Sequence, residues 1–179
     1  MIHLKLPVTK DTLASLHAGD EVTLTGTLYT ARDAAHKRIF ELLAEKKQLP
    51  IEINGAVIFY AGPTPPKVGS LTCAIGPTTA TRMDPYTPIF LEQGMIACIG
   101  KGKRATYVKE ALIRHQAVYF ISIGGIAAYL SQKIESIRLI AFEDLGAEAI
   151  YELKVKDFPC IVGIDCRGND VYEQKDSPK

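Results

Sequence analysis

Short apolar runs alternate with helix-like segments along most of this chain. An apolar run bounded by glycine, proline or polar turns is typical of a strand buried on both faces, whereas strict alternation of polar and apolar residues is typical of a half-buried strand. By these criteria, strands are predicted over residues 4–7, 21–28, 56–61, 71–75, 94–100, 117–123, 134–142, 149–155 and 160–165. The segment 21–28 alternates polar and apolar residues and is predicted to be half-buried.

Helical spacing separates several of these runs. Helices are predicted over residues 9–16, after the strand at 21–28 as far as about 43, from the 76–81 turn through 91, over 106–115 and over 126–132, with Thr9 as a possible cap of the first. Residues 62–69 are predicted to be a loop and 173–179 a frayed tail. Buried strands that alternate with helices predict an α/β fold, with a largely parallel or mixed sheet covered by helices on both faces.

Composition narrows the class of protein. The chain has 179 residues, of which 47% are hydrophobic and 23% charged, as expected for one globular domain over 1–179. A net charge of +1 offers no basic surface for nucleic acid. No apolar run approaches the ~20 residues that span a bilayer. The first residues are too few and too polar for a secretory signal, so the cytoplasm is the expected compartment.

The four cysteines do not form a recognisable site. Cys73, Cys98 and Cys160 lie in apolar strand-like runs, Cys166 lies near a turn, and none belongs to a C-x-x-C pair. We interpret them as buried, inert thiols. Their spacing argues against a zinc site, a disulfide framework or iron–sulfur ligation by this chain alone, so no metal site is expected on it.

The richest polar segment is Gly76-Pro77-Thr78-Thr79-Ala80-Thr81-Arg82. We expect a strand, a tight turn and then a helix capped by Thr78 or Thr79, with Pro77 beside the helix start. Thr78 and Arg82 are four apart and would share one helix face. A helix start with free N–H groups, hydroxyls and a guanidinium suits a carboxylate or a phosphate. The alternative is an ordinary capped helix with an exposed arginine.

A second polar cluster follows the strand at 21–28. Arg32 and His36 are four apart on one face of the next helix, and Asp33 and Lys37 are placed to form a solvated ion pair. For His36, a structural role is the commoner one, and a catalytic role stays open. Lys101 also follows a buried strand, as does the Gly124-Gly125 turn. Ligands of such sheets bind beyond the carboxyl ends of the strands, so these groups are expected to gather at one edge.

Several common motifs are absent. Gly100-Lys101 is followed by Gly102 rather than by Ser or Thr, so this segment is not a Walker A loop. The sequence has no dinucleotide fingerprint, no G-x-S-x-G elbow and no H-E-x-x-H. We interpret Lys101-Gly102-Lys103-Arg104 as part of an anion site or as a solvated turn.

Taken together, the segments 26–38, 76–83, 101–102, 124–125, 158–159 and 168–170 resemble the class I (iron–sulfur) fumarases. The match is to their C-terminal domain, which in many bacteria and archaea is a separate β subunit. The L-tartrate dehydratase β subunit is similar in the same segments and is the near alternative. The resemblance implies a swivelling β/β/α fold. It also implies an α subunit whose three cysteines hold a [4Fe–4S] cluster, with one open iron acting as a Lewis acid.

The resemblance further implies roles for individual residues. Arg32 and Arg82 would clamp the carboxylates of the substrate, Lys101 would add a cation, and Thr78 would abstract a proton; Thr79 stays an alternative to Thr78. Thr79 and His36 are also expected to line the substrate site. Lys103 stands where the family often has Asn.

The expected activity is reversible hydration of fumarate to L-malate, in a site shared with the α subunit. Two other possibilities are a dicarboxylate-binding module without catalysis and a subunit whose motifs serve assembly. The isolated chain could also form a homodimer through the surface meant for the α subunit.

Overall fold

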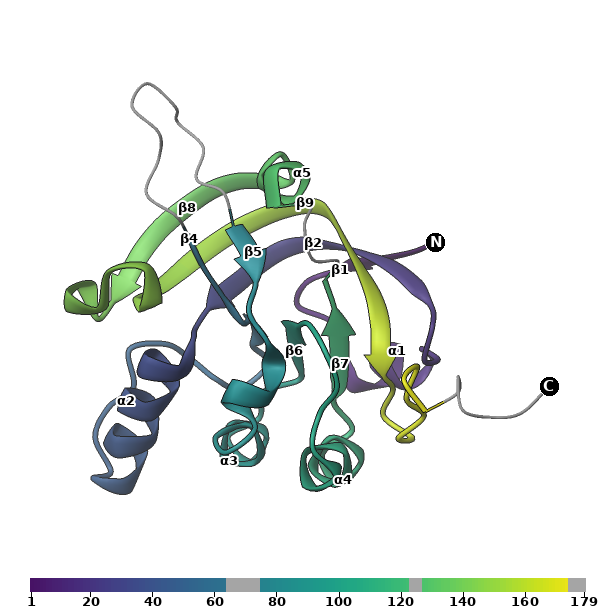
Figure 1. Ribbon diagram of the computed structural model, residues 1–179, viewed down its shortest axis with the longest axis horizontal. Coiled ribbons are helices and arrows are strands. Elements are labelled where there is room, and N and C mark those ends of the chain that lie inside the picture. The colour runs from purple at the N-terminus through teal and green to yellow at the C-terminus, as the bar shows by residue number, and fades with distance from the viewer. Residues whose placement is uncertain (64–74, 123–126, 174–179) are drawn as a thin grey trace.

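The computed structural model describes residues 1–63, 75–122 and 127–173, which form a seven-stranded mixed sheet and a two-stranded sheet, flanked by helices (Figure 1). The strands are β1 (Ile2–Lys5), β2 (Glu21–Thr30), β3 (Val57–Phe59), β4 (Ala61–Pro63), β5 (Ile75–Pro77), β6 (Ala97–Gly100), β7 (Val118–Ile121), β8 (Ile134–Ala141) and β9 (Ile150–Ile164). The helices are α1 (Lys10–Ala14), α2 (Asp33–Ala44), α3 (Thr87–Glu92), α4 (Thr106–His115) and α5 (Ala127–Ser131), with 3-10 turns η1 (Ala80–Met83) and η2 (Glu143–Glu148).

The main sheet closes on itself. Strands β2, β3, β6 and β7 are parallel neighbours in that order, and β9 runs antiparallel to both β7 and β2, which completes a ring. β1 extends the sheet beside β2, and β8 extends it beside β9. The mixed α/β class predicted from the sequence is confirmed. The closure was not predicted, because it depends on the long strand β9 reaching two partners.

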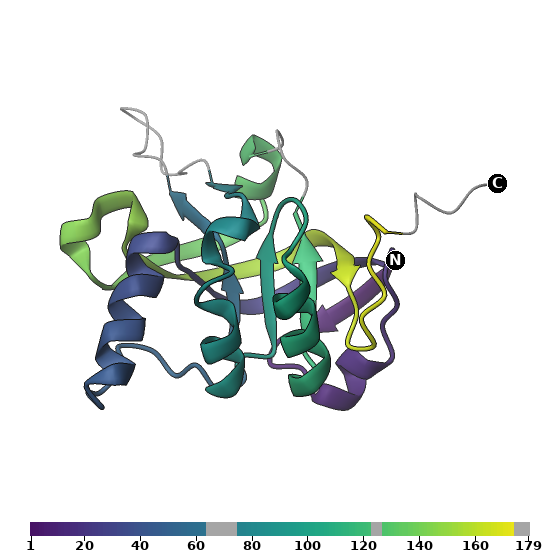
Figure 2. The same cartoon turned by 60° about the horizontal axis from the view of Figure 1, so that its bottom comes forward.

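Two hydrophobic clusters lie on opposite sides of the strands. The ring interior is filled by side chains from all its strands, such as Phe59 and Phe158, whose rings meet edge to face at 5.4 Å. Leu13 of α1 and Leu130 of α5 join this inner cluster. The outer cluster packs against α2, α3 and α4, which lie side by side across one face (Figure 2). The helices α2, α3 and α4 thus cover the outer side, whereas α1 and α5 each contribute a leucine to the inner cluster.

Local signals placed several elements correctly. The helix over Thr106–His115 has the predicted bounds, and the Oγ1 of Thr9 accepts from the backbone N–H of Thr12, so Thr9 caps α1. Within the described residues, no helix is long and apolar enough to cross a membrane. The predictions for 64–74, 123–126 and 174–179 fall outside the described residues, including Cys73 and the Gly124-Gly125 turn.

The two strands predicted at 149–155 and 160–165 are a single strand, β9. The chain continues through Pro159, which lies opposite Thr23 of β2. Around Pro159, the described pairing of β9 is with β2 alone. β8 pairs with β9 only as far as Val155 of β9, and β7 pairs with β9 only from Ile161 of β9. A proline costs no ladder hydrogen bond on an unpaired side. Asp157, with φ of 51°, marks the accompanying irregularity.

The segment after Gly76 also differs from the prediction. Instead of turning directly into one helix, Ile75–Pro77 pairs as strand β5 with Ala61–Pro63, which was predicted to be partly loop. A 3-10 turn and then α3 follow, and neither Thr78 nor Thr79 caps a helix through its side chain. Thr78 and Arg82 therefore do not share the face of one helix. Pairing between distant segments outweighed the local helix-start signal.

Candidate functional site

Backbone hydrogen bonds join Thr78 and Lys101 at the carboxyl ends of the strands. The N–H of Thr78 donates to the carbonyl of Tyr60 at 2.6 Å, and the N–H of Lys101 donates to the carbonyl of Thr78 at 3.3 Å. The carbonyl of Lys101 then accepts from the N–H of Ala80 at 2.9 Å. Thr78 is half-buried, whereas Thr79 and Lys101 are exposed. A hydroxyl and an ammonium group thus come from adjacent backbone segments that are fixed to one another.

Arg82 links this pair to the start of α2. It lies in η1, two residues after Ala80, and its guanidinium pairs with the carboxylate of Asp33, the first residue of α2. Arg32 is the preceding residue, at the N-cap position, with a side chain 27% exposed. The four residues expected at one edge are therefore connected through β5, β6, η1 and α2. Asp33 pairs with Arg82 rather than with Lys37, so the predicted Asp33–Lys37 pair is wrong.

The electrostatic basis of the site is simpler than predicted. The turn η1 has four residues, so its dipole is small and the predicted helix-start anion site is not formed. Positive charge comes instead from side chains, of which Arg82 and Lys101 are exposed and Arg32 is partly buried. A guanidinium group can bind a carboxylate through two parallel hydrogen bonds. In this structure Arg82 already faces the carboxylate of Asp33, and Arg32 faces that of Glu148.

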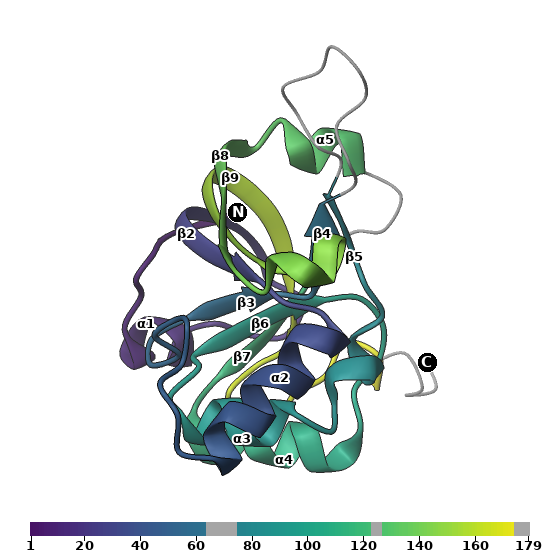
Figure 3. The ribbon, with the colours of Figure 1, turned by 90° about the vertical axis from the view of Figure 1, so that its left-hand side faces the viewer.

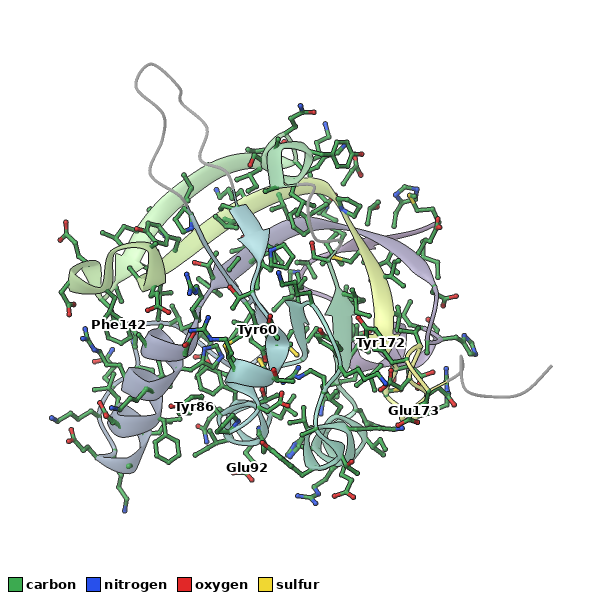
Figure 4. All side chains as sticks on the ribbon, viewed as in Figure 1. Tyr60, Tyr86, Glu92, Phe142, Tyr172 and Glu173 are labelled. Atoms are coloured by element: carbon green, nitrogen blue, oxygen red, sulfur yellow. The ribbon has the colours of Figure 1, made fainter. Side chains whose placement is uncertain are left out.

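His36 lies in the core beneath this edge. Its ring is fully buried, stacks on Phe90 with centroids 4.6 Å apart, and meets Tyr60 edge to face at 5.3 Å. Figure 4 labels Tyr60 and Tyr86, which lie between α2 and the strands and near α3. Nδ1 lies 2.8 Å from the Arg32 carbonyl and donates to it, since that oxygen only accepts. Burial lowers the pKa of His36 to about 4, so the ring is neutral. These contacts favour the structural interpretation; a substrate-binding role for His36 stays a prediction.

A buried ion pair beneath the site was missed from the sequence. Arg104, whose side chain has no exposed surface, donates through Nε to Oδ1 of Asp84 at 2.6 Å. It also donates to Oγ1 of Thr87 at 2.7 Å, and its guanidinium carbon lies 4.9 Å from the ring centroid of Tyr119. The sequence left open whether the segment 101–104 is part of an anion site or a solvated turn. Neither description fits the whole segment, because the side chain of Arg104 is buried in an ion pair. The signal available was position: Arg104 ends the segment Lys101-Gly102-Lys103-Arg104, and Asp84 lies two residues after the polar segment that ends at Arg82.

The described cysteines do not converge. Cys98 belongs to the outer cluster and Cys160 to the inner one, on opposite sides of the sheet, while Cys166 is partly exposed. Over residues 1–63, 75–122 and 127–173, no group of three or more His, Cys, Asp or Glu side chains is arranged to hold a metal ion. These residues therefore do not fit the direct ligation of an iron–sulfur cluster.

Residues 1–175 match the family model described as Fumarase C-terminus. The chain belongs to this family. The resemblance inferred from the motifs is thereby confirmed over nearly the whole length.

Similar proteins divide into two kinds. Fumarate hydratase 2 of Leishmania major is 38% identical over 177 residues, which cover 97% of this chain and 31% of that protein. The anaerobic class I fumarate hydratase of Escherichia coli is 38% identical, with 92% of this chain and 31% of that protein covered. The putative L(+)-tartrate dehydratase subunit beta of Methanocaldococcus jannaschii is also 38% identical, but there 89% of the relative is covered. This chain thus spans under a third of the two fumarate hydratases and most of the subunit.

Proposed function

We propose that this protein is the β subunit of an iron–sulfur hydro-lyase that reversibly hydrates fumarate to L-malate together with an α subunit. The observation that carries the proposal is the connection of Thr78, Lys101, Arg82 and Arg32 at one edge of the sheet. The relative named as a subunit beta, similar in length to this chain, supports a two-subunit enzyme. The [4Fe–4S] cluster is assigned to the α subunit.

Substrate binding is assigned to the cations of this edge. Fumarate and malate are small dianions, so two guanidinium groups, Arg32 and Arg82, are a suitable pair for their carboxylates. Thr79 is exposed beside Thr78 and contributes a further polar contact. The swivelling β/β/α arrangement of the family would bring this edge against the α subunit.

Proton transfer is assigned to the hydroxyl of Thr78. In the direction from malate to fumarate, this oxygen takes a proton from the carbon next to a carboxylate, and negative charge then spreads onto that carboxylate. Fixed cations are most effective where such charge develops, which is the role of Lys101 and Arg82. A free threonine hydroxyl is a weak base, so these cations also have to favour its activated form.

A tartrate dehydratase is the second candidate, because the relative that matches this chain along most of its own length carries that description. Tartrate has one more hydroxyl than malate, and a site built to bond it discriminates strongly against the substrate that lacks it. A non-catalytic subunit that binds dicarboxylates or serves assembly is the remaining alternative.

The test is anaerobic co-expression with an α subunit, followed by assays of fumarate hydration and of tartrate dehydration. Thr78→Ala should lower kcat by about 10²-fold or more, as for loss of a positioned proton acceptor, and Thr78→Ser should recover part of it. Arg82→Ala should lower kcat/KM by about 10- to 100-fold, which corresponds to a lost charged hydrogen bond.

The matched controls are Thr81→Ala, in the same turn η1, and Arg114→Ala, at the exposed end of α4; both should retain activity. Thr79→Ala distinguishes the two neighbouring hydroxyls. Full activity in both Thr78→Ala and Arg82→Ala would show that the site is wrongly assigned.

A further inference from the structure

We propose that Glu148 is a positioning residue for Arg32. In this proposal it holds the Nε edge of the guanidinium, so that the opposite edge is presented to a substrate carboxylate. The inference rests on the proposed function, in which Arg32 binds substrate. It concerns η2 (Glu143–Glu148), the turn between β8 and β9, which lies beside the N-terminal end of α2 (Figure 3).

The contact itself is an ion pair with two unsatisfied atoms. Nε of Arg32 lies 3.4 Å from Oε1 of Glu148, and the side chains are 27% and 31% exposed. Both atoms are buried and have no hydrogen-bond partner in the described part of the chain. Leaving a buried charged atom without a partner is costly, so each atom is stabilised by the opposite charge facing it.

A guanidinium is planar and carries its five N–H groups on defined edges. With Glu148 at Nε, the terminal NH1 and NH2 groups of Arg32 are the ones left for a ligand. No hydrogen bond to them is found within residues 1–63, 75–122 and 127–173. The pair of terminal N–H groups can bind a carboxylate through two parallel hydrogen bonds. Glu148 therefore decides which edge of Arg32 faces outward.

The turn that carries Glu148 is itself anchored. Arg38 of α2 makes a bidentate pair with Asp144, at 2.7 and 2.8 Å, and its guanidinium carbon lies 4.8 Å from the ring centroid of Phe142, which is labelled in Figure 4. Gly62 of β4 fits beneath the turn, since a Cβ there would lie 2.1 Å from the carbonyl oxygen of Ala147 and 3.2 Å from Cδ of Arg32. The backbone of η2 is thus held by contacts that do not involve Glu148.

This arrangement supplies a matched pair of variants. Glu148→Gln removes the charge facing Arg32, whereas Asp144→Asn weakens the other ion pair between η2 and α2 and leaves Arg32 untouched. Thermal midpoints of the two variants show whether each remains folded. Asp144 is far enough along the turn to contact Arg38 rather than any residue assigned to the site.

The first measurement uses the full chain by itself and follows the arginine Nε–H signals by NMR. Glu148→Gln should speed exchange of the Arg32 signal with water by about tenfold or more, the factor expected for a lost charged partner. Asp144→Asn should shift the Arg38 signal and leave that of Arg32 in place. An Arg32 signal unaffected by Glu148→Gln would overturn the proposal.

The second measurement is steady-state kinetics of the complex with an α subunit. Glu148→Gln should raise KM for the dicarboxylate by about tenfold with a smaller change in kcat, and Glu148→Asp should recover part of the loss. The KM and kcat of Asp144→Asn should stay within about twofold of the parent values. Equal increases in KM in Glu148→Gln and Asp144→Asn would show that Glu148 contributes only to packing. If the parent complex turns over no dicarboxylate, the proposed function fails, and the NMR result still decides the Glu148–Arg32 contact.

Discussion

Arg104 and Asp84 form a fully enclosed ion pair that joins the two segments carrying Lys101 and Arg82. Nε of Arg104 donates to Oδ1 of Asp84 at 2.6 Å, and the backbone N–H of Ala105 donates to Oδ2 at 2.9 Å. Asp84 is two residues after Arg82, and Arg104 is three after Lys101. The backbone segments that carry the two proposed cations are therefore joined beneath the site by a buried contact.

Removing one member of this pair should be strongly destabilising. Asp84→Ala leaves the charge of Arg104 buried without its carboxylate, for which we expect a loss of about 3–5 kcal/mol in the free energy of unfolding. Urea denaturation measures it. Glu173→Ala, which breaks the exposed pair with Lys109, is the control and should change stability little. A small effect of Asp84→Ala would mean that water or another group reaches Arg104.

His36 should make stability depend on pH. Burial lowers its pKa from 6.5 to about 4. The unfolded chain therefore binds the proton more readily than the folded one, and stability should fall as the pH drops from about 6.5 towards 4, by about 3 kcal/mol in total. His36→Phe keeps an aromatic ring in the stack and should flatten this part of the profile.

Urea denaturation at several pH values, with the parent and His36→Phe in parallel, measures the effect. An unchanged slope in His36→Phe would assign the dependence to other groups.

Gly62 should not tolerate a side chain. A Cβ at this position would lie 2.1 Å from the carbonyl oxygen of Ala147, which is backbone and cannot rotate away. Gly62→Ala should cost about 1–3 kcal/mol and displace η2, with a fall in kcat/KM in the complex because Arg32 lies in the same contact. The control is Gly76→Ala in the paired strand, where the nearest atom among the described residues would be Cβ of Ala127 at 3.5 Å. Equal stability of the two variants would contradict the prediction.

The described cysteines should differ in reactivity. Burial raises the pKa of Cys160, and Cys98 is also enclosed, with its sulfur 3.3 Å from NH1 of Arg104. Cys166 is partly exposed. Labelling of the native protein with a small alkylating reagent, followed by peptide mass spectrometry, should modify Cys166 well before Cys98 and Cys160. Early labelling of Cys160 would indicate that the ring interior opens.

Local pattern was sufficient for several features. The helix Thr106–His115, the Thr9 cap and the buried strands follow from spacing and capping chemistry, which act over a few neighbouring residues. The position of Lys101 and Arg32 at strand ends was also predictable, because consecutive parallel strands end at the same edge of a sheet. The residues of the candidate site could thus be proposed from the sequence, whereas their arrangement in space could not.

Only the tertiary structure decided which distant groups meet. The pairing of Arg82 with Asp33, of Arg32 with Glu148 and of Arg104 with Asp84 joins residues separated by 49, 116 and 20 positions, as their numbers in the sequence show. The same holds for β9, whose two predicted halves became one strand once β2 and β7 were both available as partners. Capping and periodicity act between residues close in the sequence, so the sequence alone determined the helices, strands and candidate residues. The long-range contacts exist only after the ring of strands has closed, so the tertiary structure determined which residues pair.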